Sequence, residues 1–70
     1  MTLMDVPSGK TVIIKEIKTY DTELESFLFS LGCYSGEPIT VIHKRKSGCI
    51  VVIKDARYSI DKRLANSIIV

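Results

Sequence analysis

The sequence predicts a mainly β fold in which about five short strands are interrupted by one short helix, at about residues 22–31, and bend into a small barrel. Short runs rich in β-branched residues alternate with glycine, proline and charged residues, which is typical of strands joined by tight turns. Only one stretch repeats its apolar residues with helical spacing. A barrel would also remove the open edges that a flat sheet of this size exposes.

The composition predicts a folded domain over residues 1–70. The chain has 70 residues, of which 46% are hydrophobic and 26% are charged, both ordinary values for a globular domain. The longest apolar run, Cys49–Ile53, is about a quarter of the length of a membrane-spanning helix, so we expect no membrane span. Asp5, Pro7 and Gly9 interrupt the region where a signal peptide would be apolar, which predicts a cytoplasmic protein.

The first strand is expected over residues 10–17, after a turn at residues 7–9. Val12, Ile14 and Ile17 stand there among the polar residues Thr11, Lys15 and Glu16, and the β-branched content suits a strand. A helix is then expected over residues 22–31. Thr22 and Glu25 have the spacing of a capping box, in which each side chain bonds the other residue's backbone amide. The spacing i, i+3, i+4, i+7 predicts one apolar face made of Leu24, Phe27, Leu28 and Leu31.

Two glycines bracket the passage from the helix into the second strand. Gly32 stands where a left-handed helix cap is expected, and Gly36 permits a tight reversal into a strand over residues 37–44. Together with Leu31, these glycines are the residues that we expect to form the junction. Cys33 and Tyr34 are then the side chains of the linker.

The second half of the chain predicts short β elements. A polar connection over residues 44–48 precedes a third strand over residues 49–53, which indicates an antiparallel hairpin. The next turn is expected at residues 55–57, followed by a short strand at 58–60. Residues 61–67 are expected to form a brief helical or irregular turn, and residues 68–70 a closing strand.

Neither catalytic nor metal-binding residues are predicted, and no cofactor. His43 is the only histidine, and its place in a strand beside Lys44 favours a solvent-facing side chain. Cys33 and Cys49 are far apart in the sequence and belong to no CxxC motif, so we expect two reduced, buried thiols. The scattered glycines form no phosphate-binding loop.

Basic residues near the predicted hairpin raise the alternative of a small barrel that binds nucleic acid. Such barrels pair a basic patch with stacking aromatic rings. The cations are Lys44, Arg45, Lys46, Lys54, Arg57, Lys62 and Arg63, and Tyr34 and Tyr58 could stack. The net charge is only +2, and Glu37, Asp55 and Asp61 dilute the basic patch, so nucleic acid is not the expected partner.

Four segments in order resemble the FeoA family, ferrous iron transport protein A. They are GKTVIIKEI at 9–17, LFSLGCYSGEPITVI at 28–42, YSID at 58–61, and the ending Ala65, Ile68 and Val70. Their most distinctive part, Leu31-Gly32 with Gly36, matches the LGLxPG junction of the family. The sequence departs from the family pattern at Ser35, where proline is favoured, at Phe27, where a basic residue is common, and at Cys33, where an aliphatic residue is usual.

The resemblance implies an SH3-like β-barrel with an inserted helix, and a protein that is not an enzyme. The implied role is that of an adaptor at the inner face of the membrane, bound to the cytoplasmic domain of the ferrous iron transporter GTPase, FeoB. We expect Tyr34 and Phe29 to form the contact surface, because Tyr34 lies between glycines and Phe29 lies off the apolar helix face. Two alternatives stand beside this interpretation. The two rings could be structural, or the chain could be a nucleic-acid-binding SH3-like or OB-like barrel.

Overall fold

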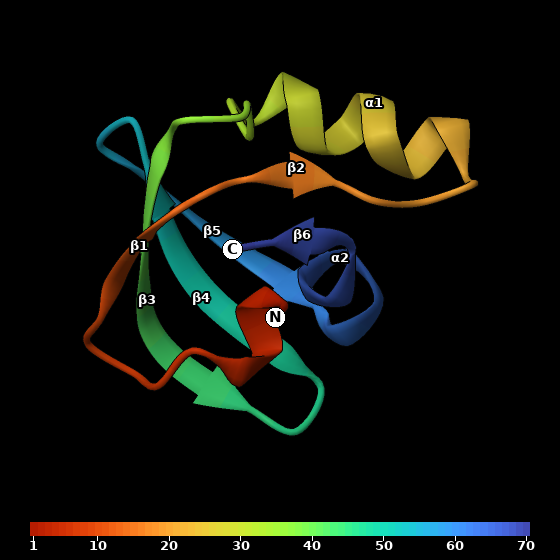
Figure 1. The fold of residues 1–70 in the computed structure, drawn as a ribbon. Helices are drawn as coiled ribbons and strands as arrows, with labels where there is room; N and C mark the ends of the chain where they lie inside the picture. The colour runs from red at the N-terminus through yellow and green to blue at the C-terminus, as the bar shows by residue number, and fades with distance from the viewer.

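The computed structural model describes residues 1–70 and is mainly β (Figure 1). In chain order the elements are a 3-10 helix η1 (Leu3–Asp5), β1 (Thr11–Ile13), β2 (Glu16–Ile17), α1 (Thr22–Ser30), β3 (Pro38–Arg45), β4 (Gly48–Ile53), β5 (Ala56–Asp61), α2 (Lys62–Ser67) and β6 (Ile68–Ile69). One antiparallel sheet has the strand order β1-β3-β4-β5, and a second pairs β2 with β6. The mainly β fold is therefore confirmed, although strand pairing does not close the sheets into a continuous barrel.

The predicted first strand, residues 10–17, is divided between the two sheets. β1 pairs with β3, whereas β2 pairs with β6 at the other end of the chain. Between them Ile14 is fully buried, and its N–H donates to the carbonyl oxygen of Glu37 at 2.9 Å. The N–H of Lys15 donates to Ile69 at 2.7 Å. The chain thus changes partners at residues 14–15, and an apolar pattern alone cannot distinguish one strand from two that meet at a bend.

Helix α1 begins at Thr22, as predicted, but the predicted capping box of Thr22 and Glu25 is wrong. The N-cap is Asp21, whose carboxylate accepts hydrogen bonds from the N–H groups of Glu23 at 3.0 Å and Leu24 at 3.2 Å. Asp is as good an N-cap as Thr, and its negative charge also lies favourably at the helix N-terminus. The cap therefore lies one residue earlier than the motif indicated.

The buried face of α1 is narrower than its apolar spacing predicts. Leu24 and Leu28, one turn apart, are buried, and Leu31 just after the helix is partly buried. Phe27 is 48% exposed, so its assignment to the core is wrong. Adjacent helix residues differ by about 100° in direction, and a face centred on Leu24 and Leu28 therefore leaves Phe27 at its margin.

The hairpin of β3 and β4 is confirmed, with its turn at Lys46–Ser47. The pairing shifts between Val41 and His43, so that Ile42 forms a bulge and is 37% exposed. Because the extra residue breaks the alternation of the strand, the rest of β3 is exposed, including His43 as predicted.

The second hairpin turns earlier than predicted. Its turn residues are Lys54 and Asp55, with φ of +50° and +66°, rather than residues 55–57. Positive φ at both positions is the requirement of a two-residue type I′ hairpin. β5 consequently begins at Ala56 and is longer than the predicted 58–60. Residues 62–67, predicted as a helical or irregular turn, form the helix α2.

The core is one cluster of buried hydrophobic side chains drawn from both sheets, both α-helices and the N-terminal segment. Leu3 and Val6 are 1% and 0% exposed, although the sequence pattern assigned the first residues to no element. α2 packs against η1 and β4. In Figure 1 the N-terminal η1 lies beside α2 and near the C-terminus, so both ends of the chain help to enclose the core.

Replacing the buried Leu28 by alanine should lower the free energy of unfolding by about 2–5 kcal/mol, because the change empties core volume. The neighbouring Phe27→Ala should cost clearly less, since that ring is half exposed. Urea unfolding of the two variants beside the wild type measures both losses. Equal losses would show that the two faces of α1 are buried alike.

Candidate interaction site at the glycine junction

The end of α1 is locked by a pair of hydrogen bonds that require a left-handed residue. Gly32 has φ of +97°, and its N–H donates to Phe29 at 3.0 Å. The N–H of Cys33 reaches back to the carbonyl of Leu28 at 3.1 Å. This is the Schellman arrangement, in which two helix-end carbonyls are satisfied, and it is accompanied by burial of Leu28 and Cys33 in the same core cluster.

A second reversal follows at once. The N–H of Glu37 donates to Tyr34 at 3.0 Å, which closes a turn with Gly36 in its third position at φ of +90°. The N–H of Gly36 donates to Ile14 at 2.7 Å, and Glu37 accepts from the N–H of Ile14 at 2.9 Å. The junction is therefore hydrogen-bonded to the strand connection at Ile14, and the structure agrees with the conformational roles predicted for Gly32 and Gly36.

The junction brings together the two aromatic residues that the sequence singled out. The rings of Phe29 and Tyr34 are stacked, with centroids 5.7 Å apart and planes 14° from parallel. They remain 38% and 49% exposed. Phe29 comes from the last turn of α1 and Tyr34 from the linker, so the locked helix end holds both rings in one orientation. We call these two residues the ring stack.

A cation from another part of the fold completes this surface. The Nζ of Lys54, in the turn between β4 and β5, lies 6.0 Å from the centroid of the Tyr34 ring. It also donates to Glu37 Oε1 at 2.9 Å. A Cβ on Gly32 would lie 3.0 Å from Cδ of Lys54, so the missing side chain leaves room for the lysine stem. From the sequence, Lys54 belongs only to the predicted basic patch, because nothing local links it to Tyr34.

Both thiols are buried and reduced, as predicted. Cys33 is 0% and Cys49 3% exposed, and neither forms a disulfide. Burial raises the pKa of the Cys33 thiol to about 11. The pKa of Cys49 is also raised by burial, and nearby Lys44 offsets part of the rise. Protonated thiols are poor nucleophiles and metal ligands. Nowhere does the chain bring together three or more His, Cys, Asp or Glu side chains in a metal-binding cluster.

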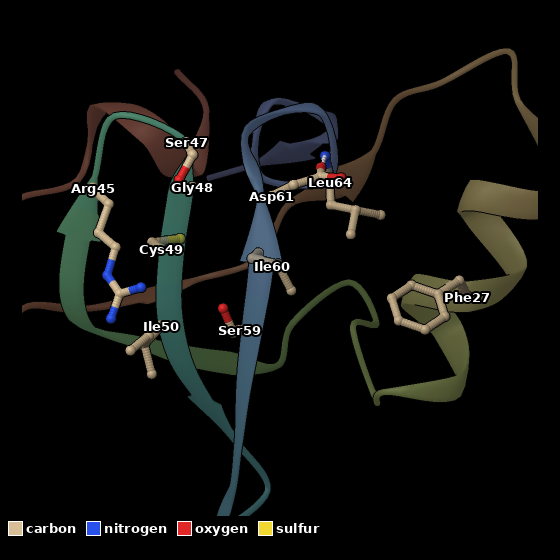
Figure 2. A pocket seen from close by; sticks show the side chains of 10 residues that line it. All are labelled: Phe27, Arg45, Ser47, Gly48, Cys49, Ile50, Ser59, Ile60, Asp61 and Leu64. Carbon is tan, nitrogen blue, oxygen red and sulfur yellow. Dashed lines mark hydrogen bonds between the residues drawn. The ribbon is translucent and has the colours of Figure 1, made fainter.

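A groove that the sequence did not predict lies on another part of the molecule. It has a volume of about 350 Å³ and extends from Arg45 of β3 past β4 and β5 to Phe27 of α1, with Leu64 of α2 also in its lining (Figure 2). Phe27 was the residue that could have indicated the groove, but its helical spacing assigned it to the core.

The two tyrosines that were considered for stacking on nucleic-acid bases lie in different environments. Tyr34 belongs to the ring stack, whereas Tyr58 of β5 is partly buried and packed against the core. Because base stacking requires an exposed ring face, Tyr58 is poorly placed for it. The structure therefore does not gather both tyrosines and the basic hairpin into one stacking surface.

The model of the FeoA domain family matches residues 1–70, the whole chain. The chain belongs to the FeoA family. This family is associated with ferrous iron transport, and its LGLxPG junction is the segment that here carries the double reversal and Tyr34.

Solved structures agree with the FeoA assignment. A crystal structure of an iron uptake regulatory protein (FeoA) is 25% identical, with a TM-score of 0.85, over 97% of this chain and 93% of that one. FeoA of Stenotrophomonas maltophilia complexed with zinc, described as a prokaryotic SH3 domain protein, is 18% identical, with a TM-score of 0.87, over 99% and 87% of the two chains. The predicted SH3-like fold is thereby confirmed.

The same fold occurs within larger proteins. A manganese-dependent transcriptional repressor is 20% identical, with a TM-score of 0.89, over 97% of this FeoA chain but only 39% of the repressor. A search of curated proteins found no match to the sequence. None of the helices has the length and apolar character needed to cross a membrane.

Gly36→Val should destabilise the junction, because a β-branched residue strongly disfavours the observed φ of +90°. No neighbouring atom lies within 4 Å of the added Cβ, so the penalty is one of backbone conformation and not of space. Gly36→Asn is the matched variant, since asparagine tolerates positive φ better. Thermal melts should rank the wild type above Asn and Asn above Val; equal melting of Val and Asn would contradict a conformational requirement.

The raised pKa of Cys33 predicts a loss of stability at high pH. The folded state keeps the thiol protonated up to about pH 11, whereas an unfolded thiol ionises near its ordinary value of 9.0. Burial of the protonated Cys33 thiol therefore makes its full contribution to the free energy of unfolding below pH 9. This contribution is lost as pH rises toward 11, and the loss is about 2 kcal/mol at pH 11. The difference in unfolding free energy between wild type and Cys33→Ala should be constant below pH 9 and change by this amount above it; a pH-independent difference would refute the prediction.

Proposed function

We propose that this chain is an accessory protein of ferrous iron uptake that binds the cytoplasmic domain of the transporter GTPase FeoB through the ring stack of Phe29 and Tyr34. On this proposal the chain acts as one FeoA domain in the cytoplasm, at the inner face of the membrane through its partner. It acts by binding and not by catalysis, and it needs no cofactor. Membership of the FeoA family supports the link to iron uptake.

The observation that carries the choice of surface is the exposure of two stacked rings on a rigid junction. Rings in contact with each other lose little further conformational entropy on binding, and aromatic side chains are enriched among the residues that dominate interface energies. An unbound surface that exposes two adjacent rings is a candidate contact patch. Tyr34 can also offer its hydroxyl as a hydrogen-bonding group to a partner.

Lys54 and Glu37 give this surface a polar rim. Their ion pair is partly exposed, 52% at Lys54 and 27% at Glu37, and pairs in contact with solvent contribute little to stability by themselves. Its position beside Tyr34 suits the usual anatomy of an interface, where an apolar centre is surrounded by polar groups. A partner patch with an apolar centre and mixed charges at its edge would complement it.

Tyr34→Ala and Phe29→Ala should each weaken binding to the FeoB cytoplasmic domain about tenfold or more, the loss expected for an interface anchor worth over 1 kcal/mol. Their melting temperatures should change little, because both rings are substantially exposed. Calorimetric titration of each folded variant against that domain measures the effect. Tyr20→Ala is the matched control, since Tyr20 is fully exposed and outside the ring stack.

Unchanged affinity in both variants would show that the rings are structural and that the contact surface lies elsewhere. A salt series distinguishes the nucleic-acid alternative. Phosphate contacts make affinity fall steeply with salt, whereas an apolar contact is much less sensitive. We expect weak salt dependence with the FeoB domain and no salt-sensitive binding to single-stranded RNA.

A further inference from the structure

β5 leaves one side of its backbone without a partner. It is the last strand in the sheet order β1-β3-β4-β5 and pairs only with β4. Outside that ladder, no backbone hydrogen bond involves residues 56–60. With six residues, β5 offers a much longer open edge than β1, which has three. An edge of this kind is a template for another extended segment.

The turn determines which groups the open edge presents. In a two-residue hairpin the residues that flank the turn, Ile53 and Ala56, form a hydrogen-bonded pair, and hydrogen-bonded and non-hydrogen-bonded pairs then alternate along the ladder. Arg57 and Ser59, opposite Val52 and Ile50, therefore direct their N–H and C=O groups away from β4. These two residues are also exposed.

The groove described above adjoins this edge. Ser59 and Ile60 of β5 line it together with Phe27 of α1, and Figure 2 shows Phe27 across the side of β5 that faces away from β4. A segment placed along β5 would bring alternate side chains toward the exposed Phe27 ring and toward Leu64. The groove thus combines free backbone groups with apolar surface, the two parts of a strand-addition site.

We propose that this groove binds an extended segment of a partner protein, with alternating apolar and acidic side chains, as an added strand along β5. The acidic preference follows from Arg57 of β5, which is exposed, forms no ion pair and would lie opposite a residue of the added strand on the same face. Asp61, the acidic residue in the lining, already accepts the N–H of Leu64 at 2.8 Å as the cap of α2. An incoming carboxylate would therefore meet an available cation.

A single extended segment fits better here than a second copy of the chain. α1 and α2 both contribute to the groove lining, so the added strand has protein on its far side. A strand that belongs to another sheet would carry its own neighbours into that space. The surface is separate from the ring stack, because Phe27 and Phe29 differ by about 200° around the helix. The inference therefore does not depend on the proposed FeoB contact.

The test uses the whole protein, labelled with 15N, and a capped peptide of about eight residues that alternates valine and glutamate, long enough to cover one strand. NMR hydrogen exchange is followed for each amide. Strand addition should slow exchange of the Arg57 and Ser59 amides about tenfold or more at saturation, because these N–H groups gain partners. A peptide alternating valine and lysine should bind at least about tenfold more weakly.

Three variants and two controls separate the contributions of the backbone edge, the charge and the apolar ring. Ser59→Pro removes an outward N–H that β4 does not use, and it should abolish binding of the valine-glutamate peptide. Arg57→Glu should weaken binding about tenfold, whereas Lys46→Glu, which makes the same charge change in the turn between β3 and β4, should have a much smaller effect. Phe27→Ala should weaken binding, and Phe29→Ala on the other side of α1 should not.

Arg57→Glu and Phe27→Ala alter exposed side chains, so the test stands even if Ser59→Pro fails to fold. Absence of binding, or binding without protection of the Arg57 and Ser59 amides, would overturn the proposal. Equal effects of Arg57→Glu and Lys46→Glu would overturn the acidic preference. A dimer in sedimentation experiments that Ser59→Pro abolishes would assign the β5 edge to a second copy instead.

Discussion

The double reversal between α1 and β3 is the constraint on which most of the structure depends. Two glycines with positive φ, Gly32 and Gly36, turn the chain within five residues from a helix into the central hairpin. The reversal buries Leu28 and Cys33 together and connects the linker backbone to Ile14. In so small a protein, few other contacts could hold α1 in place if this backbone conformation were lost.

The same reversal links the fold to its candidate function. Because helix-end carbonyls are satisfied by Gly32 and Cys33, the last turn of α1 is held against fraying, and Phe29 and Tyr34 keep their stacked geometry in solvent. The β4–β5 turn then adds Lys54 beside Tyr34. The end of α1, the linker and the turn between β4 and β5 thus form one surface, which we propose as the contact surface.

The two sheets do not close into a barrel, and this leaves one strand edge available for binding. Although the core is enclosed by α2, η1 and both sheets, the pairing order ends at β5 and leaves its backbone edge beside a groove. Natural proteins commonly protect such edges with charged side chains, and Arg57 on β5 is one. An unprotected stretch beside an apolar groove is suited to binding, because backbone hydrogen bonds supply affinity while the side chains supply selection.

The sequence by itself determined the local features. Gly32 and Gly36, the hairpin of strands at about residues 37–44 and 49–53, and the nearness of Phe29 to Tyr34 could be predicted, because each depends on φ preferences, periodicity or residues close in the chain. The buried thiols could be predicted because free cysteines are usually buried. Helix capping was misassigned by one residue because Asp21 and Thr22 are comparable caps. Tertiary structure alone decided the remaining features: the division of residues 10–17 between two sheets, the exposure of Phe27, the place of Lys54 over Tyr34, and the open edge of β5. Each of these results from contacts between distant segments, and local propensities carry no record of which partner a strand or side chain will meet.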